Sequence, residues 1–255
     1  MQTSLTGKTA VITGGGRGIG LTVARALAAD GADIALFDLL DNVEETAKQI
    51  ADQYGVRTLG RRLDVTDQVA TATAFDEVTE SLSVPQVLLT AAGIEINGDS
   101  ADVTAAQWRA VIDVNLTGTF FSAQAFGRGL LAAGLPGSAI LISSMSGLIV
   151  NVPQWAASYN SSKAAVAHLA KSLAVEWASA DIRVNAMAPG YVLTDLTRQI
   201  IEKEPALQEE WIALIPQRRM ATPDDLTGLV SFLASEVSSY ITGQQIVIDG
   251  GYTAI

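Results

Sequence analysis

A tyrosine, a lysine and a serine are spaced so that together they could move a proton at an alcohol oxygen. Tyr159 and Lys163 are four residues apart, and on a helix such a pair shares one face. Ser144 follows the apolar, strand-like run Ala139–Ile142. A phenol has an unperturbed pKa of about 10, which a neighbouring ammonium lowers. We therefore expect Lys163 to lower the pKa of Tyr159, which exchanges the proton while Ser144 hydrogen-bonds the substrate oxygen.

An asparagine completes this candidate catalytic set. Asn115 lies within a long helical pattern, Ala105–Ala133, where a helix has no need of an amide. The hypothesis is that Asn115 holds a water linked to Lys163 and so provides a route for the proton. Taken singly, each of these residues has a plainer alternative: a core tyrosine, an exposed lysine or a helix-surface amide.

A glycine-rich stretch, Thr13–Gly20, points to a phosphate-bearing ligand. It follows a strand-like run and precedes the amphipathic helical pattern Ile19–Asp30. Glycines let the backbone approach a pyrophosphate closely, and a helix N-terminus offers free N–H groups to phosphates. A plain tight turn is the alternative. The residues of this stretch predicted to bind a dinucleotide are Gly14, Arg17, Gly18, Ile19 and Gly20.

The last residue of the second strand-like run indicates which dinucleotide binds. Asp38 lies about 20 residues beyond the glycines, where a carboxylate accepts hydrogen bonds from the adenosine ribose and repels a 2′-phosphate. This favours NAD, although Arg17 could hold a 2′-phosphate. Asp41, rather than Asp38, is expected to cap the next helix. Asp64 ends the third run and Val65 follows it; Asp64 could bind the adenine amino group or be a turn carboxylate.

Strand-like runs alternate with helical patterns along the whole chain, which predicts one α/β domain, residues 1–255, with a doubly wound parallel sheet and helices on both faces. Ligands of such sheets bind at the carboxyl ends of strands. The helical patterns include Ile19–Asp30, Asn42–Gln53, Ala105–Ala133 and Tyr159–Ser179. The strand-like runs are Thr9–Thr13, Asp33–Asp38, Thr58–Asp64, Val87–Thr90, Ala139–Ser143, Arg183–Ala186 and Gln245–Ile248.

The composition narrows the function classes. The chain has 255 residues, of which 49% are hydrophobic and 17% charged, and a net charge of −11. Such an acidic chain argues against nucleic acid as a partner. The absence of cysteine excludes disulfides, thiolate catalysis and Cys-based zinc sites. No apolar run reaches the length of a membrane span, so we expect a cytoplasmic protein. Because the chain has no cysteine and a single histidine, His168, we expect no metal centre.

The whole set of motifs resembles the classical short-chain dehydrogenase/reductase family. Thr13–Gly20 resembles its TGxxxGxG motif and Ala92-Gly93 its NAG segment. The resemblance implies a seven-stranded Rossmann-type sheet, often a homotetramer, and the catalytic tetrad Asn115, Ser144, Tyr159 and Lys163. It also implies cofactor contacts from Ala92, Gly93, Tyr159 and Lys163 and from a nicotinamide-binding loop with Pro189, Gly190, Val192 and Thr194.

One position departs from the family pattern. Thr90 stands where the family usually has an asparagine that braces the central sheet. A threonine hydroxyl offers fewer hydrogen bonds than an amide. We therefore expect a weaker local brace without a change in the chemistry.

The segment of residues 191–216 is the expected substrate lid. Its apolar residues alternate with charged ones in an amphipathic pattern, which could close over the substrate or pack small helices on the domain. These residues are Leu196, Ile200, Leu207, Trp211 and Leu214. His168, the only histidine, lies roughly 140° round the helix from Lys163, so it should not join the site.

Polar residues after strand-like runs suggest a polyhydroxylated substrate. The expected substrate contacts are Ser144, Ser146, Asn151, Gln154 and Tyr159, with Glu95 as a further polar group; solvated loop residues are the alternative. The runs Ser144–Gln154 and Asp249–Thr253 resemble galactitol dehydrogenase-like polyol dehydrogenases of the family. The favoured function is thus an NAD-dependent secondary-alcohol dehydrogenase acting on a sugar alcohol or vicinal diol. The alternatives are an NADP-dependent reductase of 3-oxoacyl or keto-sugar substrates and a non-catalytic NAD-binding sensor.

Overall fold

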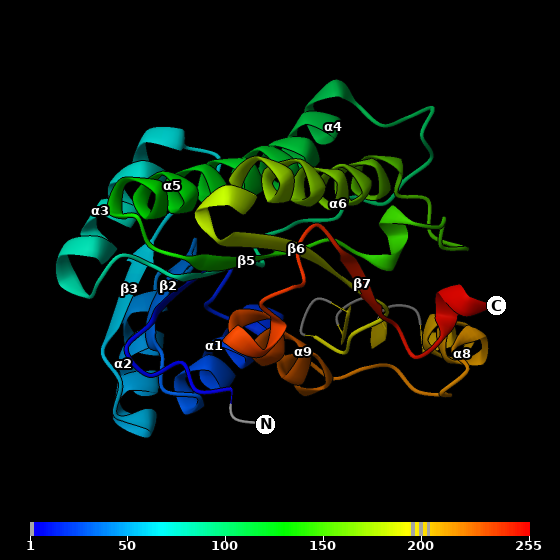
Figure 1. Cartoon of the computed structure of the whole chain (residues 1–255). Coiled ribbons are helices and arrows are strands. Elements are labelled where there is room, and N and C mark those ends of the chain that lie inside the picture. Colours follow the sequence, from blue (N-terminus) through cyan, green and yellow to red (C-terminus); the bar gives the residue numbers. More distant parts are fainter. Residues whose placement is uncertain (1–2, 195–196, 199–200, 203–204) are drawn as a thin grey trace.

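The computed structural model describes residues 3–194, 197–198, 201–202 and 205–255 (Figure 1). Leu196 and Ile200 of the expected lid lie outside these described residues. One parallel sheet runs through the molecule in the order β3-β2-β1-β4-β5-β6-β7. Its strands are β1 Thr9–Thr13, β2 Asp33–Asp38, β3 Thr58–Arg62, β4 Val87–Thr90, β5 Gly137–Ile142, β6 Ile182–Pro189 and β7 Gln245–Ile248.

Helices cover both faces of the sheet, which confirms the predicted fold class (Figure 1). One face carries α1 (Gly18–Ala29), α2 (Val43–Tyr54) and α9 (Asp224–Ala234). The other carries α3 (Gln68–Ser81), α5 (Gly118–Ala133) and α6 (Ala157–Trp177). Among the described residues, no helix has the length and apolar character that a membrane span requires.

The apolar strand runs arise because the sheet is buried on both sides. In β1, Ala10 and Ile12 pack into the core beneath α1 and α9, while Val11 packs into the core beneath α5 and α6. All three are fully buried. A strand covered on both faces has no solvent face on which to place polar residues, so its sequence is continuously apolar.

β1 and β4 pair with each other in the middle of the sheet, and the strand order reverses between them. Connections leave these two strands in opposite directions, which opens a crevice at their carboxyl ends. The glycine-rich stretch lies after β1, and Ala91 and Ala92 follow β4. The fold therefore places the predicted cofactor loop at the topological switch point.

The long helical pattern Ala105–Ala133 is not one α-helix. It contains α4 (Ala105–Ile112), a π-helical segment (Asp113–Thr117) and α5. Asn115 lies in the π-helical turn and is fully buried. Single-turn π segments inside helices are frequent at functional sites. Hydrophobic periodicity alone could not reveal this insertion.

The remaining differences from the expected elements lie at their ends. β3 ends at Arg62, two residues before the expected Asp64, and β6 extends through Pro189 instead of ending at Ala186. The expectation that Asp41 caps α2 was wrong. The N-cap residue is Asn42, with no side-chain cap, and Asp41 forms an ion pair of 2.9 Å with Arg62.

Thr90 leaves a hydroxyl unused in the centre of the sheet. Its Oγ1 atom is buried and has no hydrogen-bond partner among the described residues. Leaving a polar group unpaired in a core costs about 1–3 kcal/mol. The expected weak brace at this position is therefore confirmed.

Replacing Thr90 with valine is expected to raise the free energy of unfolding by about 1 kcal/mol, because valine keeps the shape and removes the unpaired hydroxyl. This corresponds to a rise in Tm of roughly 2–4 °C. Thr9→Val is the matched control, since Thr9 is also buried in β1 but its Oγ1 is 2.7 Å from Ser83 Oγ. The control should lower Tm. A fall in Tm for Thr90→Val would contradict the interpretation.

Candidate active site

The glycine-rich loop is shaped by close backbone contacts that exclude side chains. Gly14 has a φ of +65°, and a Cβ there would lie 2.6 Å from the Ala92 nitrogen. A Cβ on Gly20 would overlap the Gly14 carbonyl oxygen, and Gly18 has a φ of +55°. The loop thus packs tightly against the end of β4 while α1 begins at Gly18. This arrangement fits a dinucleotide, whose phosphates need bare backbone and a helix N-terminus.

Asp38 lies directly beside this loop at the end of β2. Its Oδ2 accepts a hydrogen bond of 2.9 Å from the Gly16 N–H, and its Oδ1 accepts one of 3.2 Å from the Leu40 N–H. The carboxylate is therefore held at the cofactor crevice. The Arg17 side chain, the expected counter-indication, is exposed.

The two predicted cofactor residues shortly after β3, Asp64 and Val65, have structural roles of their own. Asp64 is exposed, and its Oδ1 accepts hydrogen bonds from the N–H and hydroxyl of Thr66, at 2.9 and 2.8 Å. The turn-carboxylate alternative thus holds for this oxygen. Val65 is buried, and a Cβ on Gly118 would lie 2.6 Å from its Cγ2. Val65 therefore packs against the start of α5.

The serine and the tyrosine–lysine pair meet where β5 ends and α6 begins. Lys163 is buried, and its Nζ donates a hydrogen bond of 2.9 Å to the Ile142 carbonyl and lies 5.6 Å from the centre of the Tyr159 ring. Ser143 ties the two elements together by donating to the Lys163 carbonyl at 2.7 Å. A Cβ on Gly147 would lie 2.8 Å from the Lys163 carbonyl carbon, so α6 approaches this turn closely.

The electrostatics of Tyr159 differ from the expectation. Burial, together with the negative charge of Glu95, raises the pKa of Tyr159 to about 12, and a hydrogen bond with Ser144 only partly offsets this. Burial lowers the pKa of Lys163 to about 8, against the opposing effect of Glu95. The prediction that Lys163 lowers the pKa of Tyr159 was therefore wrong. The desolvation of a phenolate dominates, so Tyr159 is held as a neutral phenol.

Asn115 braces the site instead of presenting free donors. Its Nδ2 donates to the Ile94 carbonyl at 2.9 Å and to Ser162 Oγ at 3.0 Å, and its Oδ1 accepts from the Ile94 N–H at 2.8 Å. Ser162 in turn donates to the Tyr159 carbonyl at 2.7 Å. Both side-chain N–H groups of Asn115 are therefore used to join the segment after β4 to α6. The predicted role of Asn115 in holding a water stays a prediction. Only the oxygen atoms of Asn115 could bind that water, because both side-chain N–H groups already have partners.

Gly93 lies between the asparagine and the lysine. A Cβ at this position would lie 3.3 Å from Asn115 Oδ1 and 3.5 Å from Lys163 Nζ. The Ala92-Gly93 segment therefore passes directly over the buried polar groups. The sequence placed this segment near the cofactor, and the structure brings it to the catalytic residues as well.

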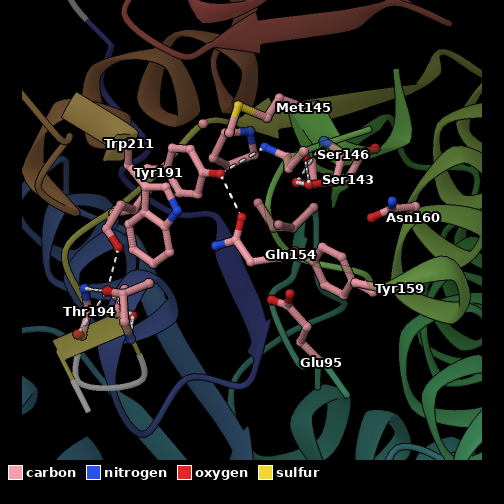
Figure 2. Close-up of a pocket in the computed structure, with 18 of the residues that line it drawn as sticks. Glu95, Ser143, Met145, Ser146, Gln154, Tyr159, Asn160, Tyr191, Thr194 and Trp211 are labelled. Carbon is pink, nitrogen blue, oxygen red and sulfur yellow. Dashed lines mark hydrogen bonds between the residues drawn. The ribbon is translucent and has the colours of Figure 1, made fainter. Parts of the chain in front are cut away.

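A cavity of about 180 Å³ opens in front of Tyr159 (Figure 2). Ser144, Ser146, Asn151, Gln154 and Glu95 all line it, as the sequence suggested. The expected cofactor-loop residues Ile19, Pro189, Gly190, Val192 and Thr194 line its other side. His168 is exposed on α6 and does not line the cavity, as expected. The structure thus brings the expected catalytic, nicotinamide and substrate residues to one place.

A chain of hydrogen bonds runs along the wall of the cavity. Ser144 Oγ is 3.2 Å from Ser146 Oγ, which donates to Asn151 Oδ1 at 2.7 Å. Asn151 Nδ2 reaches the Tyr191 hydroxyl at 3.3 Å, and that hydroxyl donates to Gln154 Oε1 at 3.1 Å (Figure 2). The polar wall is thereby held in position before any substrate arrives.

Sequence reasoning missed the role of Tyr191 in this wall. Its ring stacks on Trp211 with centroids 4.4 Å apart and an interplanar angle of 10°. Trp211 comes from α8 (Pro205–Leu214) and is almost fully buried, and its Nε1 has no hydrogen-bond partner among the described residues. The signal available in the sequence was the position of Tyr191 directly after Pro189-Gly190. An aromatic residue there follows the predicted nicotinamide loop directly and lines the cavity.

Comparison with known proteins agrees with this geometry. The sequence profile of the family described as "Enoyl-(Acyl carrier protein) reductase" matches residues 14–253. The chain is 41% identical to D-arabinitol 2-dehydrogenase [ribulose-forming] of Scheffersomyces stipitis, over 97% of this chain and 94% of that protein. It is also 41% identical to galactitol 2-dehydrogenase (L-tagatose-forming) of Cereibacter sphaeroides, over 98% and 96% of the two chains.

A solved structure gives the same result. The crystal structure of a short-chain type dehydrogenase/reductase from Mycobacterium marinum superposes with a TM-score of 0.94 and 40% identity, covering 100% of this chain and 98% of that one. Similarity at this level over whole chains covers the sheet, the cofactor loop and the site together. The chain belongs to the short-chain dehydrogenase/reductase family, whose members bind a nicotinamide cofactor.

Proposed function

We propose that this protein interconverts a sugar alcohol and its ketose, using NAD. The observation that carries the proposal is the cavity in front of Tyr159, in which Ser144 continues into a wall of polar side chains that a simple alcohol would not need. The names of its 41% identical relatives, which refer to arabinitol and galactitol, support the same substrate class.

The residues divide the reaction between them. NAD, when bound, would supply the acceptor for the hydride of the alcohol carbon. In oxidation the phenolate of Tyr159 would take up the hydroxyl proton as the ketone forms. Ser144 hydrogen-bonds the reacting oxygen in both directions. In reduction, Tyr159 gives the proton, and its raised pKa keeps it protonated for that step. Lys163, with a pKa of about 8, is still largely charged at neutral pH and favours the phenolate needed for oxidation.

The proposed binding set for NAD runs along the carboxyl ends of the strands. The glycine loop with Arg17 and Ile19 would hold the pyrophosphate, Asp38 the ribose, and Asp64 with Val65 the adenine. Ala92, Gly93, Tyr159 and Lys163 would contact the nicotinamide side. The nicotinamide side would be completed by Pro189, Gly190, Val192 and Thr194. We also propose that the segment of residues 191–216, which carries Trp211 onto the cavity, closes over the substrate.

Replacing Asp38 with serine is expected to lower kcat/KM for NAD about 10-fold to 100-fold and to raise that for NADP. The reason is that a charged acceptor for the ribose is lost together with its repulsion of a 2′-phosphate. Steady-state kinetics with both cofactors measure this. Asp41→Ser is the control, because Asp41 is exposed and paired with Arg62. If the unmodified enzyme prefers NADP, the role given to Asp38 is wrong.

A substrate panel tests the function itself. Pentitols, hexitols, vicinal diols, simple secondary alcohols and 3-hydroxyacyl compounds would be compared by NADH absorbance. We expect the highest kcat/KM with polyols. Turnover confined to acyl compounds with NADP would support the reductase alternative. Absence of turnover with intact NAD binding would support the sensor alternative, against which the joint placement of Ser144, Asn115, Tyr159 and Lys163 argues.

We further propose that the enzyme is a homotetramer, as its family resemblance implies, and that it works in the cytoplasm. Exposed apolar side chains on α4, α5 and α6 support association of subunits; they include Trp108, Phe120, Leu131 and Val175. Sedimentation equilibrium measures the assembly, and a monomer at micromolar concentration would contradict this part of the proposal.

A further inference from the structure

The described lining of the cavity includes one acidic side chain besides its hydrogen-bonded polar wall. Glu95 follows the Ala92-Gly93 segment and lines the cavity together with Ser144, Gln154 and Tyr159. Figure 2 shows its carboxylate directed into the cavity, beside Gln154 and Tyr159. It is exposed at the mouth of the cavity, so a substrate can reach it without rearrangement of the core.

The charge of Glu95 reaches the reacting centre. Its negative charge acts on both Tyr159 and Lys163, raising the pKa of each. Its own pKa is raised by desolvation, which a hydrogen bond from Asn97 and the charge of Lys163 partly offset. An anion bound in front of Tyr159 would therefore experience repulsion from Glu95.

Among the other described residues that line the cavity, none carries a charge at neutral pH. The polar side chains of the cavity wall are neutral at this pH and form a chain of hydrogen bonds that runs from Ser146 through Asn151 and Tyr191 to Gln154. These groups can donate and accept, so they tolerate any hydroxylated chain. A carboxylate can only accept, and it favours ligands that present O–H donors. Selection by charge in this cavity therefore falls to Glu95.

We propose that Glu95 is a specificity-determining residue that makes the site select neutral polyols and ketoses and reject aldonates, their carboxylate-bearing counterparts. This inference rests on the proposed polyol dehydrogenase function and names its substrate class more narrowly. A polyol presents adjacent hydroxyls to the carboxylate as donors. An aldonate with the same carbon chain has a carboxylate in place of one terminal CH₂OH. The carboxylate of Glu95 repels this group.

The test compares matched substrate pairs in wild type and Glu95→Gln. The pairs are galactitol with galactonate, and D-arabinitol with D-arabinonate. Two charges in a partly hydrated site interact strongly enough to change binding about tenfold. We expect Glu95→Gln to raise the ratio of kcat/KM for aldonate to that for polyol about tenfold. Because both members of a pair react at Tyr159, any change in the pKa of Tyr159 cancels in this ratio.

Two further measurements separate charge from shape. Raising the ionic strength to 1 M shortens the screening length to about 3 Å, so the wild-type ratio should move toward that of Glu95→Gln while the variant's ratio stays constant. Asp102→Asn is the control variant, because Asp102 is exposed on the same connection but does not line the cavity. Its ratio should equal that of wild type.

The outcomes distinguish this inference from the function on which it rests. If wild type oxidises none of the polyols, the proposed function fails and the inference falls with it. If polyols are oxidised but Glu95→Gln leaves the aldonate-to-polyol ratio unchanged, only the inference is overturned. A ratio that rises equally in Asp102→Asn would also overturn it, because the effect would then belong to the overall charge of the protein.

Discussion

Replacing Tyr159 with phenylalanine is expected to lower kcat for polyol oxidation by about 10³-fold to 10⁴-fold, while the Kd for NAD changes by less than about threefold. A positioned acid or base contributes typically 10²-fold to 10⁴-fold. Among the titratable side chains described in the cavity wall, Tyr159 is the one that hydrogen-bonds Ser144. Phenylalanine keeps the ring that packs beside Lys163 and removes only the hydroxyl.

Turnover with the best polyol and calorimetric titration with NAD measure the two quantities for this variant. Tyr240→Phe is the matched control, because the Tyr240 side chain is fully exposed and does not line the cavity. The control should keep wild-type kcat. Turnover of Tyr159→Phe within tenfold of wild type would show that the proton moves by another group.

Replacing Lys163 with methionine is expected to lower kcat for oxidation about 10²-fold to 10³-fold at pH 7. The rise of kcat with pH should also shift to higher pH. Oxidation needs the phenolate of Tyr159, and a positive charge 5.6 Å from the ring centre favours it. Without that charge the phenolate forms only at higher pH, so the rate rises later on the pH scale. Reduction uses the neutral phenol and should lose less at low pH.

The lowered pKa of Lys163 adds a sharper expectation. Because burial lowers the pKa of Lys163 to about 8, we expect its ammonium to be lost above this pH in the wild type too. The oxidation rates of wild type and Lys163→Met should therefore converge as the pH rises from 7 to 10. Lys171→Met, an exposed lysine on the same helix, is the control and should match wild type throughout. Parallel profiles would contradict an electrostatic role for Lys163.

Local patterns predicted much of this protein correctly. The seven strands, the glycine loop after β1 and the tyrosine–lysine pair on one helical face were all readable, because each depends on the spacing of residues near in sequence. The order of these motifs along the chain also indicated the family. Strand ends and the cap of α2 were less certain, because they depend on contacts with neighbouring elements. One such contact is the ion pair of Arg62 with Asp41.

Other features depended on contacts between distant residues. The π-helical turn that buries Asn115 breaks a pattern that is uniformly helical in sequence, and its amide bonds to residues 21 and 47 positions away. Tyr191 joins the cavity wall through partners 37 and 40 residues distant. Nothing in their immediate neighbours indicates these partners.

By itself, the sequence determined which elements form and which residues with reactive groups lie at their ends, because backbone propensity and hydrophobic spacing act over a few residues. The tertiary structure alone decided the state of those groups. Packing from several elements removes water from Tyr159 and raises its pKa where adjacent spacing predicted a fall, and it sets Glu95 close enough to act on it. Desolvation and charge interactions depend on all atoms within several ångströms, and only the folded chain brings those atoms together.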